Sequence, residues 1–207
     1  MFSGLISLLA PPLCIACAGD AGRAAPLCRE CRAELSRSAR GRNAPAGCWA
    51  AFPYDGPAGA MVRALKFGGR VPVADVMAAQ LASHAPPELL AGTLVPVPVH
   101  EQHRRRRGLA HAHVLAEALS RRTGLVIADC LERSGDPRPQ VGRGRRERMA
   151  GVAGAVSVRR GSEPPAQALL VDDVVTTGAT IAACGKALRA AGAVRVGAIA
   201  YARTAAR

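Results

Sequence analysis

From about residue 50 onward, apolar positions fall into short segments whose pattern alternates between that of helices and that of strands. Helical segments are expected at 58–66, 73–83, 109–122 and 180–191. Shorter runs, rich in apolar and β-branched residues, predict strands at 94–99, 168–171 and 194–200. Strands that alternate with helices in this way predict an α/β fold with a mostly parallel sheet flanked by helices.

The first part of the chain lacks this alternation. Residues 14–48 contain five of the seven cysteines, and the polar, turn-rich stretch Arg37–Pro45 ends this region. We therefore expect two units, which are a small cysteine-rich module within residues 1–48 and an α/β domain at residues 49–207. Gly124 and Gly192 are expected to end the helices that precede them.

The opening stretch Met1–Leu13 is apolar. It has no early Lys or Arg, as a secretory signal would need, and it is too short to span a bilayer. It predicts a short helix packed on the domain that follows. We expect a cytoplasmic protein with no membrane insertion.

Composition narrows the class of partner. Hydrophobic residues make up 49% of the chain but aromatic residues only 3%, so the core must be built mainly from Ala, Val and Leu. The formal net charge of +13 predicts a phosphate-rich partner, either nucleic acid or a polyphosphate small molecule. The scarcity of aromatic side chains argues against a module that stacks on bases.

The most informative segment is Ala168–Ile181, which reads ALLVDDVVTTGATI. An apolar strand is followed by two acids and then by small and hydroxyl residues at a helix start, where backbone N–H groups and the helix dipole attract a phosphate. Gly178 allows a close approach of the backbone or a positive φ. The two acids would repel a bare phosphate, but they suit a ligand that also carries ribose hydroxyls and a divalent cation. The proposed ligand-binding residues are Asp172, Asp173, Val174, Val175, Thr176, Thr177, Gly178, Ala179 and Thr180.

The paired CxxC motifs predict a metal site. Cys14 and Cys17 are followed after ten residues by Cys28 and Cys31, a spacing that lets four thiolates surround one structural zinc ion. A pair of disulfides and an iron–sulfur cluster are the alternatives, and reduced cytoplasmic thiols disfavour the first. Cys48, Cys130 and Cys184 are expected to be ordinary buried thiols, and a second, decayed CxxC motif is the alternative for Cys48.

Two arginine-rich segments could hold a second anion, such as a pyrophosphate. One runs from Arg104 to Gly108 between a strand and a helix, and the other lies within 133–151. The second is polar and rich in glycine, which is typical of a lid or of a surface linker. A solvated basic face is the alternative for the first. The candidate residues in these segments are Arg104, Arg107, Gly108, Arg145 and Arg148. Lys66, in the sequence LKFGG at the end of a predicted helix, is a further candidate.

The segment at 168–181 resembles the phosphoribosyl pyrophosphate (PRPP) signature of type I phosphoribosyltransferases. The order of CxxC…CxxC, LKFGG, VPVPVH, RRRRG, RRERM and LLVDDVVTTGAT resembles that of the ComF family over nearly the whole chain. The resemblance implies a type I phosphoribosyltransferase fold, PRPP bound with Mg²⁺, and Asp172 and Asp173 at the catalytic centre. It further implies a role in DNA uptake during competence, with single-stranded DNA and a helicase-type protein as partners.

The chain departs from the family pattern at three places. Leu109, Ala110 and His111 stand where Phe-Asn-Gln is usual, Gly151 stands for an Asn, and Val156 for a Phe. These changes remove amide side chains that could contact a substrate. Two functions therefore stay open, namely a phosphoribosyltransferase with an unknown acceptor and a noncatalytic adaptor that binds PRPP or a nucleotide. A PRPP-sensing transcription regulator is less favoured, since no helix-turn-helix is evident.

Overall fold

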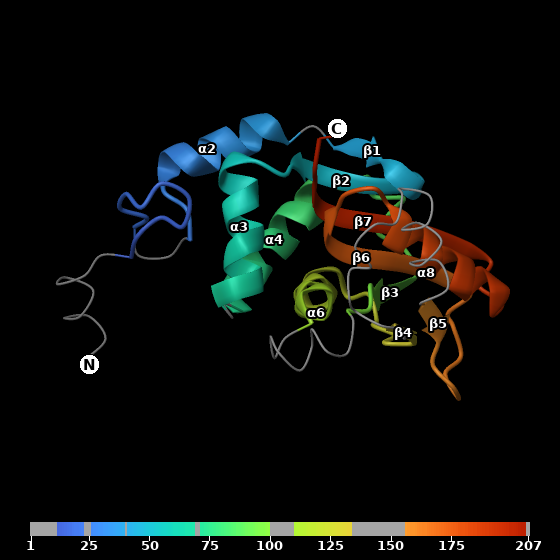
Figure 1. Ribbon diagram of the computed structural model, residues 1–207. Helices are drawn as coiled ribbons and strands as arrows, with labels where there is room; N and C mark the ends of the chain where they lie inside the picture. The colour runs from blue at the N-terminus through green and yellow to red at the C-terminus, as the bar shows by residue number, and fades with distance from the viewer. Residues whose placement is uncertain are drawn as a thin grey trace, which may run out of the picture.

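The computed structural model describes residues 12–22, 26–39, 41–68, 71–99, 110–133 and 156–205. Its centre is a five-stranded sheet (Figure 1). In spatial order the strands are β1 (Arg42–Ala44), β2 (Cys48–Pro53), β7 (Arg195–Arg203), β6 (Gln167–Val175) and β3 (Thr93–Pro96). The last four pair in parallel, and only the short β1 is antiparallel to its neighbour.

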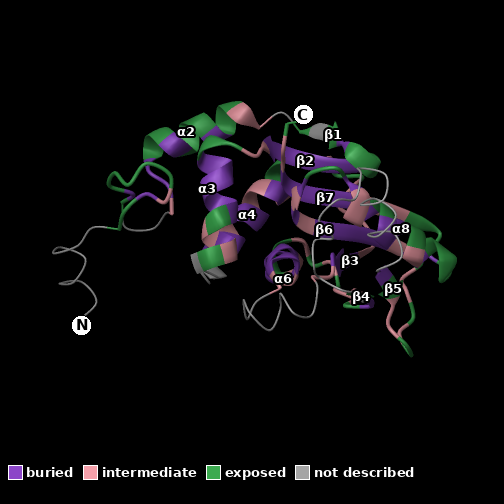
Figure 2. Ribbon diagram, viewed as in Figure 1, coloured by how far each residue is buried: buried purple, intermediate pink, exposed green. Residues whose placement is uncertain are grey.

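Helices cover both faces of this sheet. One face packs against α3 (Gly56–Gly68), α4 (Val71–His84) and α6 (His111–Thr123), and the other face packs against α8 (Ala179–Ala190) (Figure 1). The odd-numbered Leu169 and Val171 of β6 lie in the first cluster, and the even-numbered Ala168 and Leu170 lie in the second, as the two-residue period of a strand requires. The strands are buried along most of their length (Figure 2). The expected α/β fold with a mostly parallel sheet is confirmed.

The four helices predicted after residue 50 are confirmed with small shifts at their ends. Gly124 has a φ of 75° at the end of α6, and Gly192 has a φ of 108° after α8, so both helix-ending glycines are confirmed. The predicted strand at 168–171 is longer than expected. It continues to Val175, so Asp172 and Asp173 lie inside β6, with side chains on opposite faces, and not in the turn after it.

Several elements were not expected from the sequence. These are α2 (Arg29–Ser38), β1, the 3₁₀ helix η1 (Pro45–Gly47), β2, and a two-stranded sheet of β4 (Leu131–Arg133) and β5 (Val156–Val158). The strand β2 is buried at every position except its last, so its sequence lacks the alternation of apolar and polar residues that would predict a strand. The boundary at residue 48 stays a prediction, although β1, on its N-terminal side, belongs to the main sheet.

Residues 1–11 of the expected N-terminal helix lie outside the described residues, as do the two segments at 100–109 and 134–155. Cys48, Cys130 and Cys184 are buried, as expected. Within the part of the chain that the structure describes, no helix combines the length and apolar character needed to cross a membrane.

Candidate functional site

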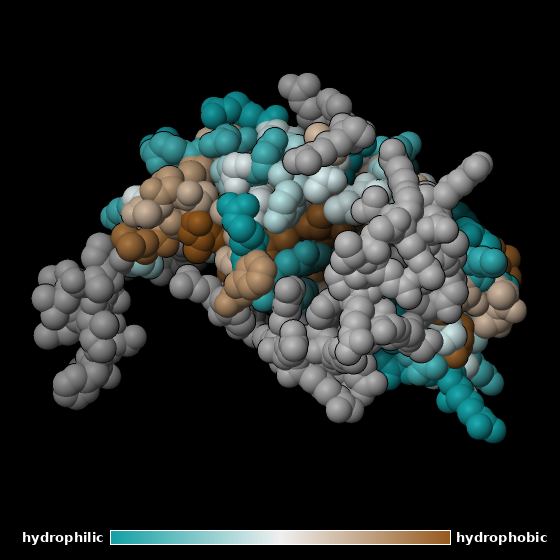
Figure 3. Space-filling view, viewed as in Figure 1, coloured by the Kyte–Doolittle hydropathy of each residue, from teal (hydrophilic) through white to brown (hydrophobic). Residues whose placement is uncertain are grey.

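The candidate site lies where the parallel strands end. After β3 the chain passes to α6 on one face of the sheet, whereas after β6 it passes directly to α8 on the other face. In open α/β sheets such a divergence leaves a crevice at the carboxyl ends of the strands, where ligands bind. On the face of the molecule that Figure 3 shows, hydrophobic residues lie beside hydrophilic ones.

Asp173 is directed to the α3 side of the sheet. Its side chain is 6% exposed, and its Oδ2 lies 3.2 Å from Nζ of Lys66, in the last turn of α3. The Lys66 ammonium therefore supplies a counter-ion for this buried carboxyl group. Lys66, a candidate for pyrophosphate contact from the sequence, thus contacts one of the two acids.

Asp172 is directed to the α8 side and is half-buried. Its Oδ1 accepts a hydrogen bond of 2.8 Å from the backbone N–H of Asp173. Burial of the carboxyl group and the adjacent charge of Asp173 raise the pKa of Asp172 to about 8, and these effects outweigh the hydrogen bond and the charge of Lys66. Burial raises the pKa of two nearby thiols, Cys48 of β2 and Cys184 of α8, to about 12. The charge of Asp172 makes a smaller contribution in the same direction.

The turn after β6 presents polar groups at the start of α8. Thr176 and Thr177 are exposed, and Thr177 Oγ1 accepts a hydrogen bond of 3.4 Å from the N–H of Ala179. Gly178 precedes the helix and gives it no side-chain cap. The first N–H groups of a helix have no partner within it, so they are available to an anion at this position.

Gly178 has a φ of 75°, so the expected positive φ is confirmed. A Cβ at this position would lie 2.9 Å from the C, O and Cβ atoms of Pro45 in η1. The space beside Gly178 is therefore filled by the segment that joins β1 to β2. Glycine is required here for packing against Pro45, whether or not a phosphate binds.

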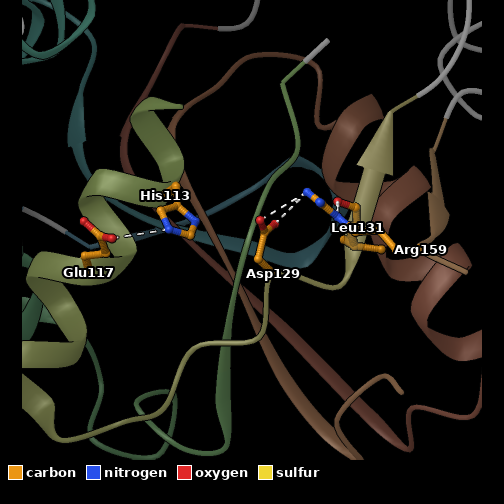
Figure 4. Close-up of polar contacts among 5 residues, drawn as sticks. All are labelled: His113, Glu117, Asp129, Leu131 and Arg159. Carbon is orange, nitrogen blue, oxygen red and sulfur yellow. Dashed lines mark hydrogen bonds and ion pairs between the residues drawn. The ribbon is translucent and has the colours of Figure 1, made fainter. Parts of the chain in front are cut away.

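A pocket of about 440 Å³, called the hollow below, lies beside β6 at the end of β3. The N–H of Val97 donates to the carbonyl of Val171 over 3.0 Å, so the hollow begins next to the acids of β6. Figure 4 shows Asp129 and Arg159 facing each other, with His113 and Glu117 on α6. Both oxygens of Asp129 accept hydrogen bonds of 3.1 Å from Arg159, and Nε of Arg159 donates to the carbonyl of Leu131. The hollow is lined by residues 96–99, 110, 113, 129, 131–133 and 159.

Val99 and Ala110, which flank the arginine-rich segment 100–109, both line this hollow. Arg104, Arg107 and Gly108 themselves lie outside the described residues, and so do Arg145 and Arg148. Their part in binding a second anion stays a prediction. A further hollow of about 520 Å³, which was not expected from the sequence, lies at the ends of β2 and β7 and includes Tyr54, Asp55 and Arg203.

The four cysteines of the CxxC motifs come together. Their Sγ atoms all lie within 4.8 Å of one another, and Cys17 Sγ is 3.7 Å from Cys28 Sγ. Four sulfurs at about 2.3 Å from one zinc ion are about 3.8 Å apart, so the cluster fits a tetrahedral site. The first motif forms a tight turn in which the Cys14 N–H donates to the Gly19 carbonyl, and the second begins α2 with Cys28 as its N-cap.

The thiols of this cluster differ in acidity. Burial raises the pKa of Cys14, but hydrogen bonds from the backbone N–H groups of Cys28, Cys17 and Ala16 together have a larger, opposite effect. The net result is a pKa lowered to about 6. Burial and hydrogen bonds with the neighbouring thiols raise the pKa of Cys31. A bound metal would require all four thiolates, so binding would release protons.

We expect the purified protein to contain about one zinc ion per chain, and Cys17→Ser to lose it. Cys17 is exposed, so its replacement removes a ligand while leaving the packing of the buried cysteines intact. The measurement is elemental analysis after gel filtration. The control is Cys48→Ala, which alters a buried cysteine outside the cluster. Equal zinc in wild type and Cys17→Ser would contradict a four-cysteine site.

The contact of Gly178 with Pro45 predicts a loss of stability. Gly124 has the same φ of 75°, but nothing lies within 4 Å of the Cβ that a substitution would add. Gly124→Ala should therefore lower the free energy of unfolding by the conformational cost alone, about 1–2 kcal/mol. Gly178→Ala should lower it further, because Pro45 must also move. Urea denaturation compares the two, and equal losses would mean that the Pro45 contact is unimportant.

No protein-family model matches the chain, and no curated protein matches it. Among solved structures, the chain is similar to one described as the structure of the allosteric regulatory enzyme of purine biosynthesis. The two are 22% identical with a TM-score of 0.41, and the match covers 67% of this chain and 30% of the other. The match thus spans less than a third of that protein. At this identity and TM-score the likeness decides nothing about function.

Proposed function

We propose that this chain is a phosphoribosyltransferase-like protein that binds PRPP, together with its Mg²⁺, at the carboxyl end of β6. The observation that carries the proposal is the acid pair at the end of a central parallel strand, immediately before a helix that opens with Thr176, Thr177 and Gly178. The acids and the helix start are adjacent, and they suit the two different ends of a sugar phosphate. The proposal explains both features with one ligand.

The 5-phosphate of PRPP would bind at the start of α8. The N–H groups of this first turn and the hydroxyls of Thr176, Thr177 and Thr180 offer donors, and the helix dipole favours negative charge there. The turn follows the strand directly, so both sides of the site are carried by one continuous segment. This arrangement needs no lysine of the kind found in a P-loop.

The ribose hydroxyls would then lie toward the acids of β6. A carboxylate accepts hydrogen bonds from vicinal hydroxyls, and such charge-assisted bonds are stronger than neutral ones. Asp172 lies on the α8 side of the sheet and is partly exposed, so it is the acid on the same face as the phosphate-binding turn. Asp173 lies on the other face and is paired with Lys66.

The hollow beside β3 is where the pyrophosphate of PRPP would extend. It adjoins β6 through the Val97–Val171 hydrogen bond, and Val99 and Ala110, which flank the segment containing Arg104 and Arg107, line it. Mg²⁺ prefers phosphate oxygens and water as ligands, so it would enter with PRPP and neutralise its charge there. In this role Lys66, Arg145 and Arg148 are further candidates from the sequence.

Two activities are consistent with such a site. In the first, a nucleophile displaces pyrophosphate from the anomeric carbon of PRPP. In the second, PRPP is bound without turnover while the protein serves as an adaptor. The motif order that resembles the ComF family extends the proposal to a cytoplasmic role in DNA uptake, with single-stranded DNA and a helicase-type protein as partners. Release of pyrophosphate from PRPP, tested with a panel of bases, amines and single-stranded DNA, distinguishes the two activities.

Replacing Asp172 and Asp173 together by Asn should weaken PRPP binding at least tenfold. The change keeps the size of both side chains but removes the charged acceptor that Asp172 offers to the ribose hydroxyls. A hydrogen bond to a charged group contributes about 1.5–3 kcal/mol, and about 1.4 kcal/mol corresponds to a factor of ten. Calorimetric titration with PRPP and Mg²⁺ measures the effect.

The matched control is Asp75→Asn, which removes an exposed carboxylate paired with Arg121 between α4 and α6. It should leave the affinity for PRPP unchanged. Absence of PRPP binding by the folded wild-type protein would refute the proposed function, and equal binding by the double variant would show that the acids do not hold the ligand.

A further inference from the structure

The hollow at the end of β3 is lined by three basic side chains of the described residues, and two of them have acidic partners. Both carboxylate oxygens of Asp129 accept hydrogen bonds from Arg159, and His113 Nε2 lies 3.3 Å from an oxygen of Glu117. Arg133, at the end of β4, forms no ion pair with any described residue, and its Nε is buried without a hydrogen-bond partner. Arg133 is therefore the basic side chain of the hollow whose charge is not compensated there.

The alternation along β4 places Arg133 on the inner face of the small sheet. Leu131 is buried in the core cluster that includes α8, Glu132 is exposed, and Arg133 is partly buried. Successive side chains of a strand point to opposite faces, so Glu132 is directed away from Arg133. The carboxylate of Glu132 instead accepts a hydrogen bond of 3.4 Å from the Ser157 hydroxyl on β5. The acid that precedes Arg133 in the chain thus does not neutralise it.

This inner face is close to the site at the end of β6. The strand β5 packs against α8, beside the main sheet (Figure 1). The charges of Arg133 and Asp172 both act on the buried thiol of Cys184 in α8, so the two groups approach the same part of the core. The hollow that Arg133 lines also includes Val97, whose N–H donates to the Val171 carbonyl of β6. Arg133 therefore lies on the side of the sheet where Asp172 and the start of α8 are found.

From these contacts we infer that Arg133 binds the pyrophosphate group of PRPP, with its guanidinium donating to the phosphate oxygens. The inference rests on the proposed function for its ligand, and it assigns a residue that the sequence did not single out. A guanidinium presents its N–H donors in a planar fork that fits two phosphate oxygens. An unpaired cation in a partly buried place is costly, and a bound anion would remove that cost.

The geometry of PRPP explains why the pyrophosphate, and not the 5-phosphate, would reach Arg133. The two anionic groups are attached to different carbons of the ribose, and the 5-phosphate is assigned to the start of α8. The hollow then receives the other group. Asp129 would repel an anion there, but Arg159 holds both of its oxygens, so the attraction comes from Arg133.

The test compares PRPP with ribose 5-phosphate, which lacks the pyrophosphate group. Calorimetric titration of the full-length chain with Mg²⁺ present measures both affinities. In Arg133→Met the affinity for PRPP should fall about tenfold or more, because a charge-assisted hydrogen bond is lost. The affinity for ribose 5-phosphate should equal that of the wild type. Arg133→Lys keeps the charge but not the planar fork, so it should recover part of the loss.

The matched control is Arg160→Met, which removes the same charge from an exposed residue that does not line the hollow. It should bind both ligands as the wild type does. Urea denaturation without ligand is the second readout. Because Arg133 has no partner among the described residues, Arg133→Met should be at least as stable as the wild type.

Equal affinity for PRPP in Arg133→Met and wild type overturns the inference and leaves the proposed function intact. A similar loss of affinity for both ligands, together with lower stability, shows a structural role for Arg133 and also overturns it. Failure of the wild type to bind PRPP overturns the proposed function. Titration with inorganic pyrophosphate and Mg²⁺ then decides the role of Arg133. Weaker binding by Arg133→Met than by wild type supports a pyrophosphate contact, and equal or absent binding refutes it.

Discussion

Strand β6 is hydrogen-bonded in parallel along both edges, to β3 on one side and to β7 on the other. This pairing fixes the register, with Val171 opposite both Pro96 and Ile199, so each side chain near its end has an assigned face. A shift by one residue would exchange the faces of Asp172 and Asp173 and would expose the alternating core residues before them. Such a shift would break the hydrogen bonds to β3 and β7 and the packing on both faces of the sheet, so the two acids stay on their assigned faces.

The same constraint explains how a core with few aromatic residues can be stable. The faces of β6 and β7 present mostly Ala, Leu and Val, which let the helices approach the sheet closely. The close packing continues beyond the strand at Gly178, where Pro45 lies against the glycine. This contact packs the start of α8 on the segment between β1 and β2. The cysteine module has only a few buried apolar side chains, such as Leu27 and Leu35. A metal bound to four thiolates would supply the folding energy that so small a core lacks.

Sequence patterns predicted the local features and missed those that depend on distant contacts. The helices around Met61, Met77 and Leu115 follow from their apolar spacing, and the CxxC spacing anticipated that the four thiols would meet. The strand β2 was missed because both of its faces are buried, so its sequence CWAAFP shows no alternation. Asp173 and Lys66 were both named, but no pattern links residues that meet only after α3 packs on the sheet.

The charge balance of the acid pair bears on how an anionic ligand could approach it. Two adjacent carboxylates would repel the phosphates of PRPP if both were fully charged and unpaired. In this structure Lys66 compensates Asp173, while burial and the charge of Asp173 keep a proton on Asp172 near neutral pH. The pair therefore presents little net charge before the ligand arrives. Hydroxyl donors of a ribose would favour the ionised form of Asp172, so binding would release a proton and form a charge-assisted hydrogen bond together. If PRPP binds as proposed, such a site would favour ligands that carry hydroxyls next to a phosphate, because a bare phosphate has no hydroxyl that could donate to the Asp172 carboxylate.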